Sequence, residues 1–496
     1  MAKKKILLLS DDLRMASGIA NVSKQLVLGT VDKYDWVQLG AAIKHPEAGK
    51  VLDLSEDIQQ RTGVKDANVK VIPFDGYGNP DVIRQLLMQE KPDAILHFTD
   101  PRYWIWLYEI EHEIRQSVPL FFYHIWDDLP DPKYNRNYYE SCDWIGCISK
   151  QTYGITKRVW SWDKEKHWTK PADWQVSYVP HGINSDLYKP VEVPKEFKKE
   201  IFGDKEYDFV LYWNNRNIRR KQPIDVILAF DKFVEALAPE HRDKVCLLMH
   251  TQPVEEHGTD LPRTIAECCS PETNVVFAPN RYSEEQLNYL YNIGDVTINV
   301  ASNEGFGLAT AESVMAGTPI IVNVTGGLQD QCGFRERGTG KLLTAEDYVE
   351  IGSLHDRHKK AGVVWGDWVK PIWPVRSTTG SVPTPYIFDD RVDFEDIAPL
   401  IMDWYKTPKE DRDAAALKGG KGGGGAGCGY YAQGGREAIM WGIETIGTNA
   451  NGYINLPGYN GGTNTGGGGG GGCHYNANNK GGDGGSGIVV IRYKYR

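Results

Sequence analysis

The sequence lacks the cysteine pattern of a disulfide framework or a zinc site. Its eight cysteines are scattered, at positions 142, 147, 246, 268, 269, 332, 428 and 473, and none has the Cys-x2-Cys spacing of a metal site. Free thiols are typical of a reducing compartment, because disulfides form and persist mainly in oxidising ones. The sequence therefore predicts a cytoplasmic protein without disulfides.

A long apolar run and an excess of positive charge are also missing. The apolar stretch near the N-terminus ends at Ser10, too early for a signal peptide or a membrane span, so we expect a buried first strand there. The formal net charge is −10. It argues against nonspecific binding to nucleic acid or to an anionic membrane, since both require a basic face. With 41% hydrophobic and 25% charged residues, the 496-residue chain has the composition of a globular protein of two or three domains.

The first half alternates short apolar runs with helical patterns. The runs that predict strands are Lys4–Ser10, Trp36–Gly40, Val69–Phe74, Ala94–Phe98, Pro119–Ile125, Trp144–Ser149 and Gln175–Pro180. The helical patterns between them include Gly18–Leu28, Asp81–Glu90 and Gln151–Trp160. Such alternation predicts a parallel sheet covered by helices on both faces, with ligand-binding residues just after the strands.

The most informative stretch is Asn303–Pro319. It lies between two apolar runs that predict strands, Asp295–Val300 and Pro319–Asn323. Its glycines, in Gly305-Phe306-Gly307, allow a sharp turn and a close approach to a ligand, and a helix is predicted over Leu308–Ala316. A helix N-terminus that follows a strand and a glycine-rich loop is an anion site, because its first N–H groups are free.

Two carboxylates, Glu304 and Glu312, flank this predicted anion site. A carboxylate beside a phosphate is repelled by it. We therefore expect the two side chains to bind hydroxyl groups on either side of the anion. A nucleotide sugar offers this arrangement, with a diphosphate between a ribose and a hexose.

Glu304 and Glu312 have seven residues between them, beginning Gly305-Phe306-Gly307-Leu308. This segment resembles the E-x7-E signature of retaining GT-B glycosyltransferases of the family 4 type. The resemblance covers roughly residues 4–417. It implies an α/β fold of two facing Rossmann-like domains with parallel sheets, a nucleotide-diphosphate sugar as donor substrate, retention of anomeric configuration, and no metal or other cofactor.

The resemblance also implies roles for individual residues. Arg216 and Lys221 match the two cations of the family's basic loop, and two fixed cations would stabilise the departing diphosphate without a metal. Glu312 would hold the ribose hydroxyls, and Glu304 the transferred sugar. His124, at the end of a predicted strand, matches the family's histidine that faces that sugar.

Donor binding would further involve Gly305, Phe306, Gly307 and Leu308 of the signature loop, and Gly18 from the first domain. Gly18 stands alone where the family usually carries a Gly-Gly pair. This departure leaves the contribution of that loop open.

Simpler interpretations remain for several of these residues. Arg219 and Arg220 stand beside the two matched cations, so the loop could be a solvated basic surface. Asp127 and Asp128 could bind the acceptor, but we favour the reading that they merely begin a loop. His181 replaces an asparagine usual in the family, and we assign it no chemistry.

The proline-rich segment Lys189–Lys195 predicts the boundary between an acceptor-side domain, residues 1–190, and a donor-binding domain, residues 191–417. A helix is expected over Phe394–Tyr405, and another begins at about 407 but is interrupted by glycines after Leu417. The glycines of Thr325–Leu328 suit a second close backbone approach. Residues 352–385 look like an elaboration, and their tryptophans, Trp365, Trp368 and Trp373, could stack on sugars or pack the core.

Residues 418–496 hold more than half of the 53 glycines and cannot bury a conventional core. Within them we expect a helix over 436–446, which could return to the first domain, and a strand over 487–496. The segment resembles C-terminal parts of phage and other viral fibre or surface proteins, which would place the protein in the host cytoplasm.

Two other functions remain open, a GT-B-type sugar-nucleotide epimerase and a non-enzymatic viral protein that binds glycans. The nucleotide, sugar, acceptor and oligomeric state are not defined by the sequence.

Overall fold

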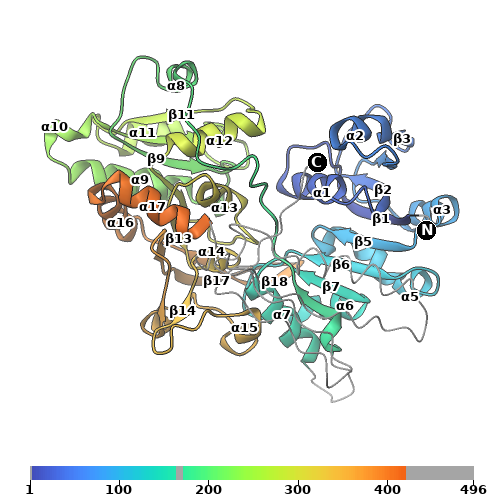
Figure 1. The fold of residues 1–496 in the computed structure, drawn as a ribbon. Coiled ribbons are helices and arrows are strands. Elements are labelled where there is room, and N and C mark those ends of the chain that lie inside the picture. The colour runs from blue at the N-terminus through green and yellow to red at the C-terminus, as the bar shows by residue number, and fades with distance from the viewer. Residues whose placement is uncertain (1–2, 163–170, 421–496) are drawn as a thin grey trace.

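The computed structural model describes residues 3–162 and 171–420, which form two α/β domains that face each other (Figure 1). Each domain is built on its own sheet. The first sheet ends at Tyr178 and the second begins at Phe209, with helix α8 (Lys195–Phe202) between them.

The first sheet has eight strands, and all but its short edge strand pair in parallel. In spatial order they are β3 (Leu52–Asp53), β4 (Val69–Pro73), β2 (Tyr34–Ala41), β1 (Lys4–Asp11), β5 (Ala94–Phe98), β6 (Leu120–His124), β7 (Trp144–Cys147) and β8 (Val176–Tyr178). Strand β1 lies in the middle of the sheet. Because helices cover both of its faces, Ile6–Leu9 are fully buried. The strand order reverses between β1 and β5.

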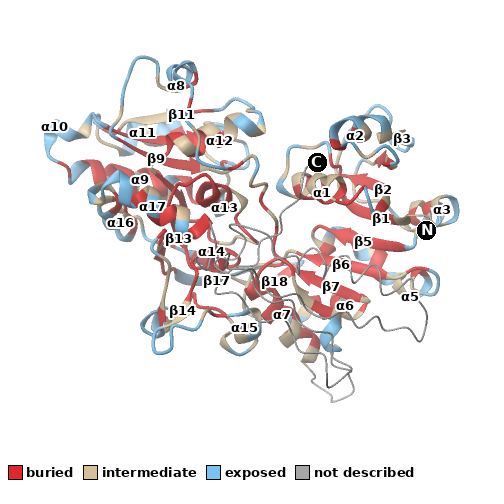
Figure 2. Cartoon of the chain, viewed as in Figure 1, coloured by how far each residue is buried: buried red, intermediate tan, exposed pale blue. Residues whose placement is uncertain are grey.

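Helices cover both faces of this sheet (Figure 1). They are α1 (Gly18–Leu28), α2 (Ser55–Thr62), α3 (Pro80–Glu90), α4 (Ile105–Glu109), α5 (Glu111–Ile114), α6 (Arg136–Glu140) and α7 (Lys150–Ser161). Figure 2 shows that the central strands of both large sheets are buried and that outer helices, such as α2 and α8, are largely exposed.

The second sheet has six parallel strands. Their spatial order is β11 (Val275–Phe277), β10 (Val245–His250), β9 (Phe209–Asn214), β12 (Val296–Asn299), β13 (Ile320–Asn323) and β16 (Val369–Ile372). The order reverses between β9 and β12. Strand β16 comes from the region that the sequence marked only as an elaboration, and Trp368 and Trp373 beside it are buried, so these two tryptophans pack the core.

The helices of the second domain follow the same plan. They are α9 (Pro223–Glu235), α10 (Pro239–Arg242), α11 (Leu261–Cys268), α12 (Glu284–Ile293), α13 (Leu308–Met315), α14 (Leu328–Gln331), α15 (Ala345–Ile351), α16 (Phe394–Lys406) and α17 (Lys409–Gly420). Two small strands, β14 (Arg335–Glu336) and β15 (Val363–Val364), form a separate pair.

The prediction that glycines interrupt the last helix after Leu417 is wrong. Helix α17 continues through Gly419 and Gly420 and packs on α13. A Cβ atom at Gly419 would lie 2.6 Å from Cγ of Trp368. Here glycine permits close packing of the helix, which outweighs its low helix propensity.

The domains contact each other along α7. The backbone N–H of Lys150 donates to the buried carboxylate of Asp330 over 3.0 Å, and its ammonium donates to the carbonyl of Leu343 over 2.7 Å. At Gly154 a Cβ would lie 2.5 Å from the Tyr348 carbonyl, so α7 and α15 approach closely. This interface holds the two domains together beside the cleft described below.

The predicted helix over 436–446, the strand over 487–496 and the rest of the glycine-rich segment beyond 420 lie outside the described residues. Among the residues that are described, no helix is long and apolar enough to cross a membrane. The six cysteines in that part of the chain are free thiols.

Candidate functional site

A cleft of about 1240 Å³ lies between the carboxyl edges of the two sheets. Its walls come from the loops after β1, β5 and β6 in the first domain and after β9 and β12 in the second. Four of these five strands flank the point where the strand order of their sheet reverses. Doubly wound sheets bind ligands at that place, because the loops on either side diverge and leave a crevice.

The loop before α13 forms part of the cleft wall, and Gly305, Phe306, Gly307 and Leu308 all line it. Gly307 has a φ of 88°, which favours glycine, and a Cβ there would lie 2.5 Å from Cδ2 of Leu328. The first N–H groups of α13 have no partner within the helix and start at this turn.

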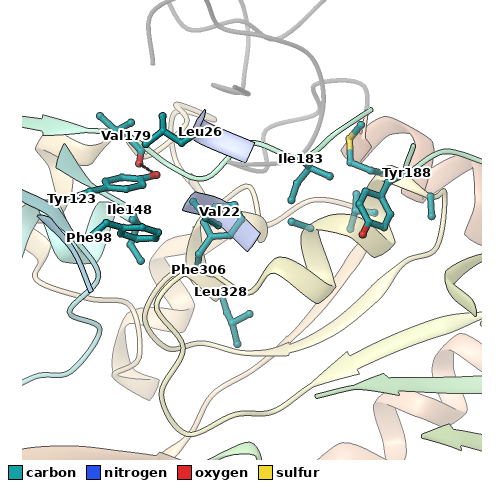
Figure 3. Packing of buried hydrophobic residues seen from close by; sticks show 14 of the residues in the cluster. Val22, Leu26, Phe98, Tyr123, Ile148, Val179, Ile183, Tyr188, Phe306 and Leu328 are labelled. Carbon is teal, nitrogen blue, oxygen red and sulfur yellow. Dashed lines mark hydrogen bonds between the residues drawn. The ribbon is translucent and has the colours of Figure 1, made fainter. Parts of the chain in front are cut away.

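Phe306 anchors this loop against the first domain. Its ring is buried and contacts His181, with the ring centroids 5.0 Å apart. Figure 3 shows Phe306 near Val22 and Ile148 of the first domain, which belong to the same hydrophobic cluster. The signature loop is therefore held by both domains.

Gly326 and Gly327 support this loop through close backbone contacts. The N–H of Gly327 donates to the carbonyl of Glu304 over 2.8 Å. A Cβ at Gly327 would lie 2.2 Å from the carbonyl oxygen of Gly305, and one at Gly326 would lie 2.1 Å from that of Glu304. The second close backbone approach predicted here is thus made to the loop that carries Glu304.

Glu304 forms a buried ion pair with Lys221, and Nη1 of Arg220 lies 3.9 Å from the same carboxylate oxygen. Lys221 is placed by a short turn that immediately precedes α9. Burial alone would raise the pKa of Glu304, but Lys221 and Arg220 outweigh it and hold that pKa below its ordinary value. Burial lowers the pKa of Lys221, and Glu304 only partly offsets this.

Arg216 also lines the cleft, but it is largely exposed and its guanidinium binds Glu255 at 2.9 Å. Arg220, which the sequence suggested only as part of a solvated loop, donates to the carbonyl of Asn303 over 2.8 Å. Of these two arginines, Arg220 is therefore the one fixed next to Glu304.

Glu312 lies eight residues beyond Glu304, on α13, and faces a group of tyrosines. Tyr291 donates a hydrogen bond to its carboxylate over 2.7 Å. Burial raises the pKa of Glu312 to about 7, although hydrogen bonds from Tyr291 and Tyr188 oppose the rise. The carboxyl group is thus part-protonated near neutral pH and bounded by hydroxyl groups.

The first domain places α1 opposite this site. Ser17 caps the helix by accepting a hydrogen bond from the N–H of Ala20 over 3.0 Å. A Cβ at Gly18 would lie 3.8 Å from Cδ1 of Leu308, an ordinary contact, so the backbone of α1 approaches the signature helix without requiring glycine. Lys24 reaches across the cleft to Glu284 at 3.1 Å.

The structure does not place His124 in the cleft. Its ring is fully buried, with Nδ1 2.9 Å from the hydroxyl of Thr156 and Nε2 3.3 Å from that of Tyr139. Burial lowers the pKa of His124 to about 3, which keeps the ring neutral. As the last residue of β6, His124 points toward α6 and α7, so the structure does not bring it to the cleft beside the other predicted site residues. The histidine that lines the cleft is His181.

The loop that follows His124 does reach the cleft, and Asp127 and Asp128 both line it. Burial raises the pKa of Asp127 to about 6, with Arg220 opposing the rise and Glu304 adding to it. The pKa of Asp128 lies well above its ordinary value, because the group is buried and Asp127 is close. The two carboxyl groups are part of the site, contrary to the simpler reading that they only begin a loop.

A hairpin of β17 (Val375–Ser381) and β18 (Thr384–Arg391) completes the wall. It extends from the second domain, and the sequence gave no sign of it. Four of its side chains line the cleft, those of Thr379, Ile387, Asp389 and Arg391. Among residues 3–162 and 171–420, no three His, Cys, Asp or Glu side chains are arranged to hold a metal ion.

Solved structures show the same arrangement of two domains. The UDP-forming α,α-trehalose-phosphate synthase of Burkholderia xenovorans superposes with a TM-score of 0.58 over 90% of this chain and 100% of its own, at 12% identity. The sucrose-phosphate synthase of Thermosynechococcus elongatus superposes with a TM-score of 0.54 over 90% and 96%, at 14% identity. The fold is GT-B. At these identities the likeness establishes the architecture alone.

Family models match two parts of the GT-B chain. Residues 194–350 match the model described as glycosyl transferases group 1, and residues 405–494 match one described as a glycine-rich domain. Over 175 residues the chain is 27% identical to the D-inositol 3-phosphate glycosyltransferase of Thermobispora bispora. That alignment spans 35% of this chain and 40% of the relative's length. The group 1 match includes Lys221, Glu304 and Glu312.

Proposed function

We propose that the protein is a glycosyltransferase that moves a sugar from a nucleoside-diphosphate sugar to a hydroxyl acceptor, with retention of anomeric configuration. The observation that carries the proposal is the buried Lys221–Glu304 pair at the turn into α13, with Arg220 beside it. It lies in the segment that matches the group 1 glycosyl transferase model. A cation and a hydroxyl-binding carboxylate are thereby held next to a helix N-terminus.

Different residues bind different parts of the donor. The diphosphate is bound by the N–H groups at the start of α13 and by Lys221 and Arg220, because its negative charge grows as the sugar leaves. Glu304 accepts hydrogen bonds from the transferred sugar, and Glu312 from the ribose. Arg216 adds a more distant cation at the rim. These cations supply the charge stabilisation, so the reaction proceeds without a metal or other cofactor.

In the transfer, the acceptor oxygen bonds to the anomeric carbon while the bond from that carbon to the diphosphate oxygen breaks. The hydroxyl proton leaves with the nucleoside diphosphate. Asp127 lies near Lys221 and Glu304 on the opposite wall of the cleft, and it is placed to orient the reacting groups.

Donor binding tests the proposal directly. UDP-, GDP-, ADP- and dTDP-glucose are each added to the full chain, and thermal stabilisation is measured, since a ligand that binds the native state raises its melting temperature. UDP-glucose is tried first, because the structural neighbour from Burkholderia xenovorans is a UDP-forming synthase. The donor that stabilises is then incubated with acceptors, and the anomeric configuration of the product is read by NMR.

We expect stabilisation by one nucleotide class and a product that keeps the donor's configuration. Inversion of configuration would refute the retaining mechanism. Conversion of the donor to an isomer without transfer would instead identify an epimerase. Absence of both binding and turnover with all four donors would refute the proposed function.

A further inference from the structure

The hairpin of β17 and β18 is firmly attached to the second domain at its base. Asn323 donates a hydrogen bond to the carbonyl of Asp390 over 2.7 Å, and the Thr325 hydroxyl donates to the Asp390 carboxylate over 2.9 Å. Arg391 forms an ion pair with Asp225 at 2.8 Å. The hairpin lies beyond the segment that matches the group 1 model, which ends at residue 350.

Beyond this base the hairpin binds the first domain. The Tyr134 hydroxyl donates to the carbonyl of Tyr386 over 3.0 Å, and the two rings meet edge to face with centroids 5.0 Å apart. Ile387 packs against the hydrophobic core of the first domain. The hairpin thus spans the two domains and closes one end of the cleft.

This end lies on the side of Glu304 that is remote from Glu312. The side-chain amide of Asn303, the residue before Glu304, donates a hydrogen bond to the backbone carbonyl of Phe388 in the hairpin over 3.0 Å. Glu312 is bounded by tyrosines of α12 and the interdomain linker instead. If the nucleoside occupies the Glu312 end, the hairpin end is left for the acceptor.

The charges at this end differ from those of a phosphate site. Arg102 and Arg391, which line the cleft at the hairpin, are committed to ion pairs with Asp100 and Asp225. Arg376 of β17 does not line the cleft, and it binds the ring of His355 and lies over the ring of Phe388. The carboxylate of Asp389 faces the cleft and has no ion pair or hydrogen bond with any side chain or backbone group that the structure describes. A free carboxylate accepts hydrogen bonds from hydroxyl groups and repels a phosphate.

We propose that the hairpin is the acceptor-side wall of the cleft and that it selects a neutral, hydroxyl-rich acceptor. Asp389 accepts a hydrogen bond from an acceptor hydroxyl, and Ile387 packs against the acceptor's carbon skeleton. The proposal rests on the glycosyl transfer proposed above. A neutral acceptor would set the protein apart from the relatives described above, which are an inositol 3-phosphate glycosyltransferase and sugar-phosphate synthases.

Two pairs of acceptors test the class, glucose against glucose 6-phosphate and inositol against inositol 3-phosphate. Each is offered to the full chain with the donor found by thermal stabilisation, and transfer is measured beside hydrolysis of the donor by water. We expect each neutral acceptor to have at least a tenfold higher kcat/KM than its phosphorylated partner.

Two hairpin variants test the wall, the isosteric Asp389→Asn and the cavity-forming Ile387→Ala. We expect each to lower the ratio of transfer to hydrolysis about tenfold, since each removes one hydrogen bond to a charged group or one apolar contact with the acceptor. The controls are Val382→Ala at the fully exposed tip of the same hairpin and Asp243→Asn on the remote α10 loop. Both should keep the wild-type ratio.

Failure of this inference is distinct from failure of the proposed function. If the wild type turns over the donor but both hairpin variants keep its ratio of transfer to hydrolysis, the hairpin is not the acceptor wall. Preference for the phosphorylated acceptors overturns the neutral class. If Ile387→Ala does not fold, Asp389→Asn decides alone, because it changes no volume. No use of any donor by the wild type refutes the glycosyl transfer itself.

Discussion

Lys221 and Glu304 neutralise each other, and their side chains are only 9% and 14% exposed, so removing either one leaves a charge that is mostly buried. We expect Lys221→Ala to lower donor turnover by on the order of 10²-fold, because a preorganised cation next to the leaving group is lost. The same change should destabilise the fold by about 3–5 kcal/mol, as for a broken buried pair. Steady-state kinetics and thermal unfolding measure the two effects.

The neighbouring arginines provide the comparison. Arg220→Ala should reduce turnover more than Arg216→Ala, because Arg220 lies 3.9 Å from Glu304 whereas Arg216 is exposed and bound to Glu255. Equal losses in the two arginine variants would contradict this ranking. Normal turnover in Lys221→Ala, Arg220→Ala and Arg216→Ala would show that the loop is only a solvated basic surface.

Glu312 gives a prediction about pH. Its pKa of about 7 in the folded protein lies above the ordinary value of 4.5. Between these pH values the folded state holds a proton that the unfolded state has released. Stability from this group is therefore complete below pH 4.5 and is lost as the pH rises to about 7. The loss is about 3 kcal/mol.

Glu312→Gln removes the titration while keeping the shape of the side chain. Relative to the wild type, this variant should become more stable by about 3 kcal/mol between pH 4.5 and pH 8. Chemical denaturation at both pH values measures the change, and Glu350→Gln on the exposed face of α15 is the control. A stability difference that does not vary with pH would show that Glu312 titrates normally.

For individual residues, the sequence predicted those of the site that lie close together in the chain. It missed those that are brought to the site by tertiary contacts. Glu304 and Glu312 belong to one loop and helix, so their spacing was informative. His124 does not line the cleft, and the sequence could not reveal this, because one position in a strand decides whether a side chain points to the cleft or to a helix. The ranking of Arg220 above Arg216 depends on which partner each guanidinium reaches, and residue spacing does not contain that information.

Among the structural elements, the turn into α13 depends most on a second element, the glycine pair before α14. At Gly327 the backbone conformation is ordinary, but an added Cβ would meet two backbone atoms of the turn, at 2.2 Å and 2.6 Å. Because backbone cannot move aside cheaply, the turn itself has to shift. We expect Gly327→Ala to weaken donor binding and to cost about 1–3 kcal/mol of stability.

Gly338→Ala is the matched control for this change, since an added Cβ there meets nothing within 4 Å. Calorimetry and titration with the stabilising nucleotide sugar measure both variants. If Gly327→Ala binds donor as Gly338→Ala does, the glycine pair does not position the turn.

Elements with a continuous apolar pattern were predictable, and those held by distant contacts were not. Strands β12 and β13 are fully buried, and their runs were recognised. Strand β17 is exposed along its whole length, with the sequence Val-Arg-Ser-Thr-Thr-Gly-Ser. It is ordered because its partner strand binds residues such as Tyr134, about 250 positions away, and a local pattern cannot reveal such a contact.

At the scale of the whole molecule, the two domains contact each other at several places, and two of these contacts lie outside the donor-binding residues. One is the contact of α7 with α14 and α15, and the other is the hairpin. The sequence led us to expect a C-terminal helix that returns to the first domain. In the described residues the hairpin makes such a bridge, whereas α17 stays on the second domain.

Helix α17 belongs to the second domain. The glycine-rich family model begins at residue 405, before this helix. The structure nevertheless packs α17 into the second domain. Arg412 is buried and binds Asp295 at 2.7 Å, and Ala416 is fully buried.

Two truncations test this boundary. Ending the chain after Gly420 should leave the melting temperature and donor binding near those of the full chain, because the composition beyond it cannot bury a core. Ending it after Thr407 removes Arg412 and leaves Asp295 buried without its ion-pair partner, at a cost of about 3–5 kcal/mol. We expect the melting temperature of this shorter chain to fall by about 10 °C. If the longer truncation product also loses stability or donor binding, the glycine-rich segment contributes to the working enzyme; if the shorter one behaves like the full chain, α17 is not part of the second domain.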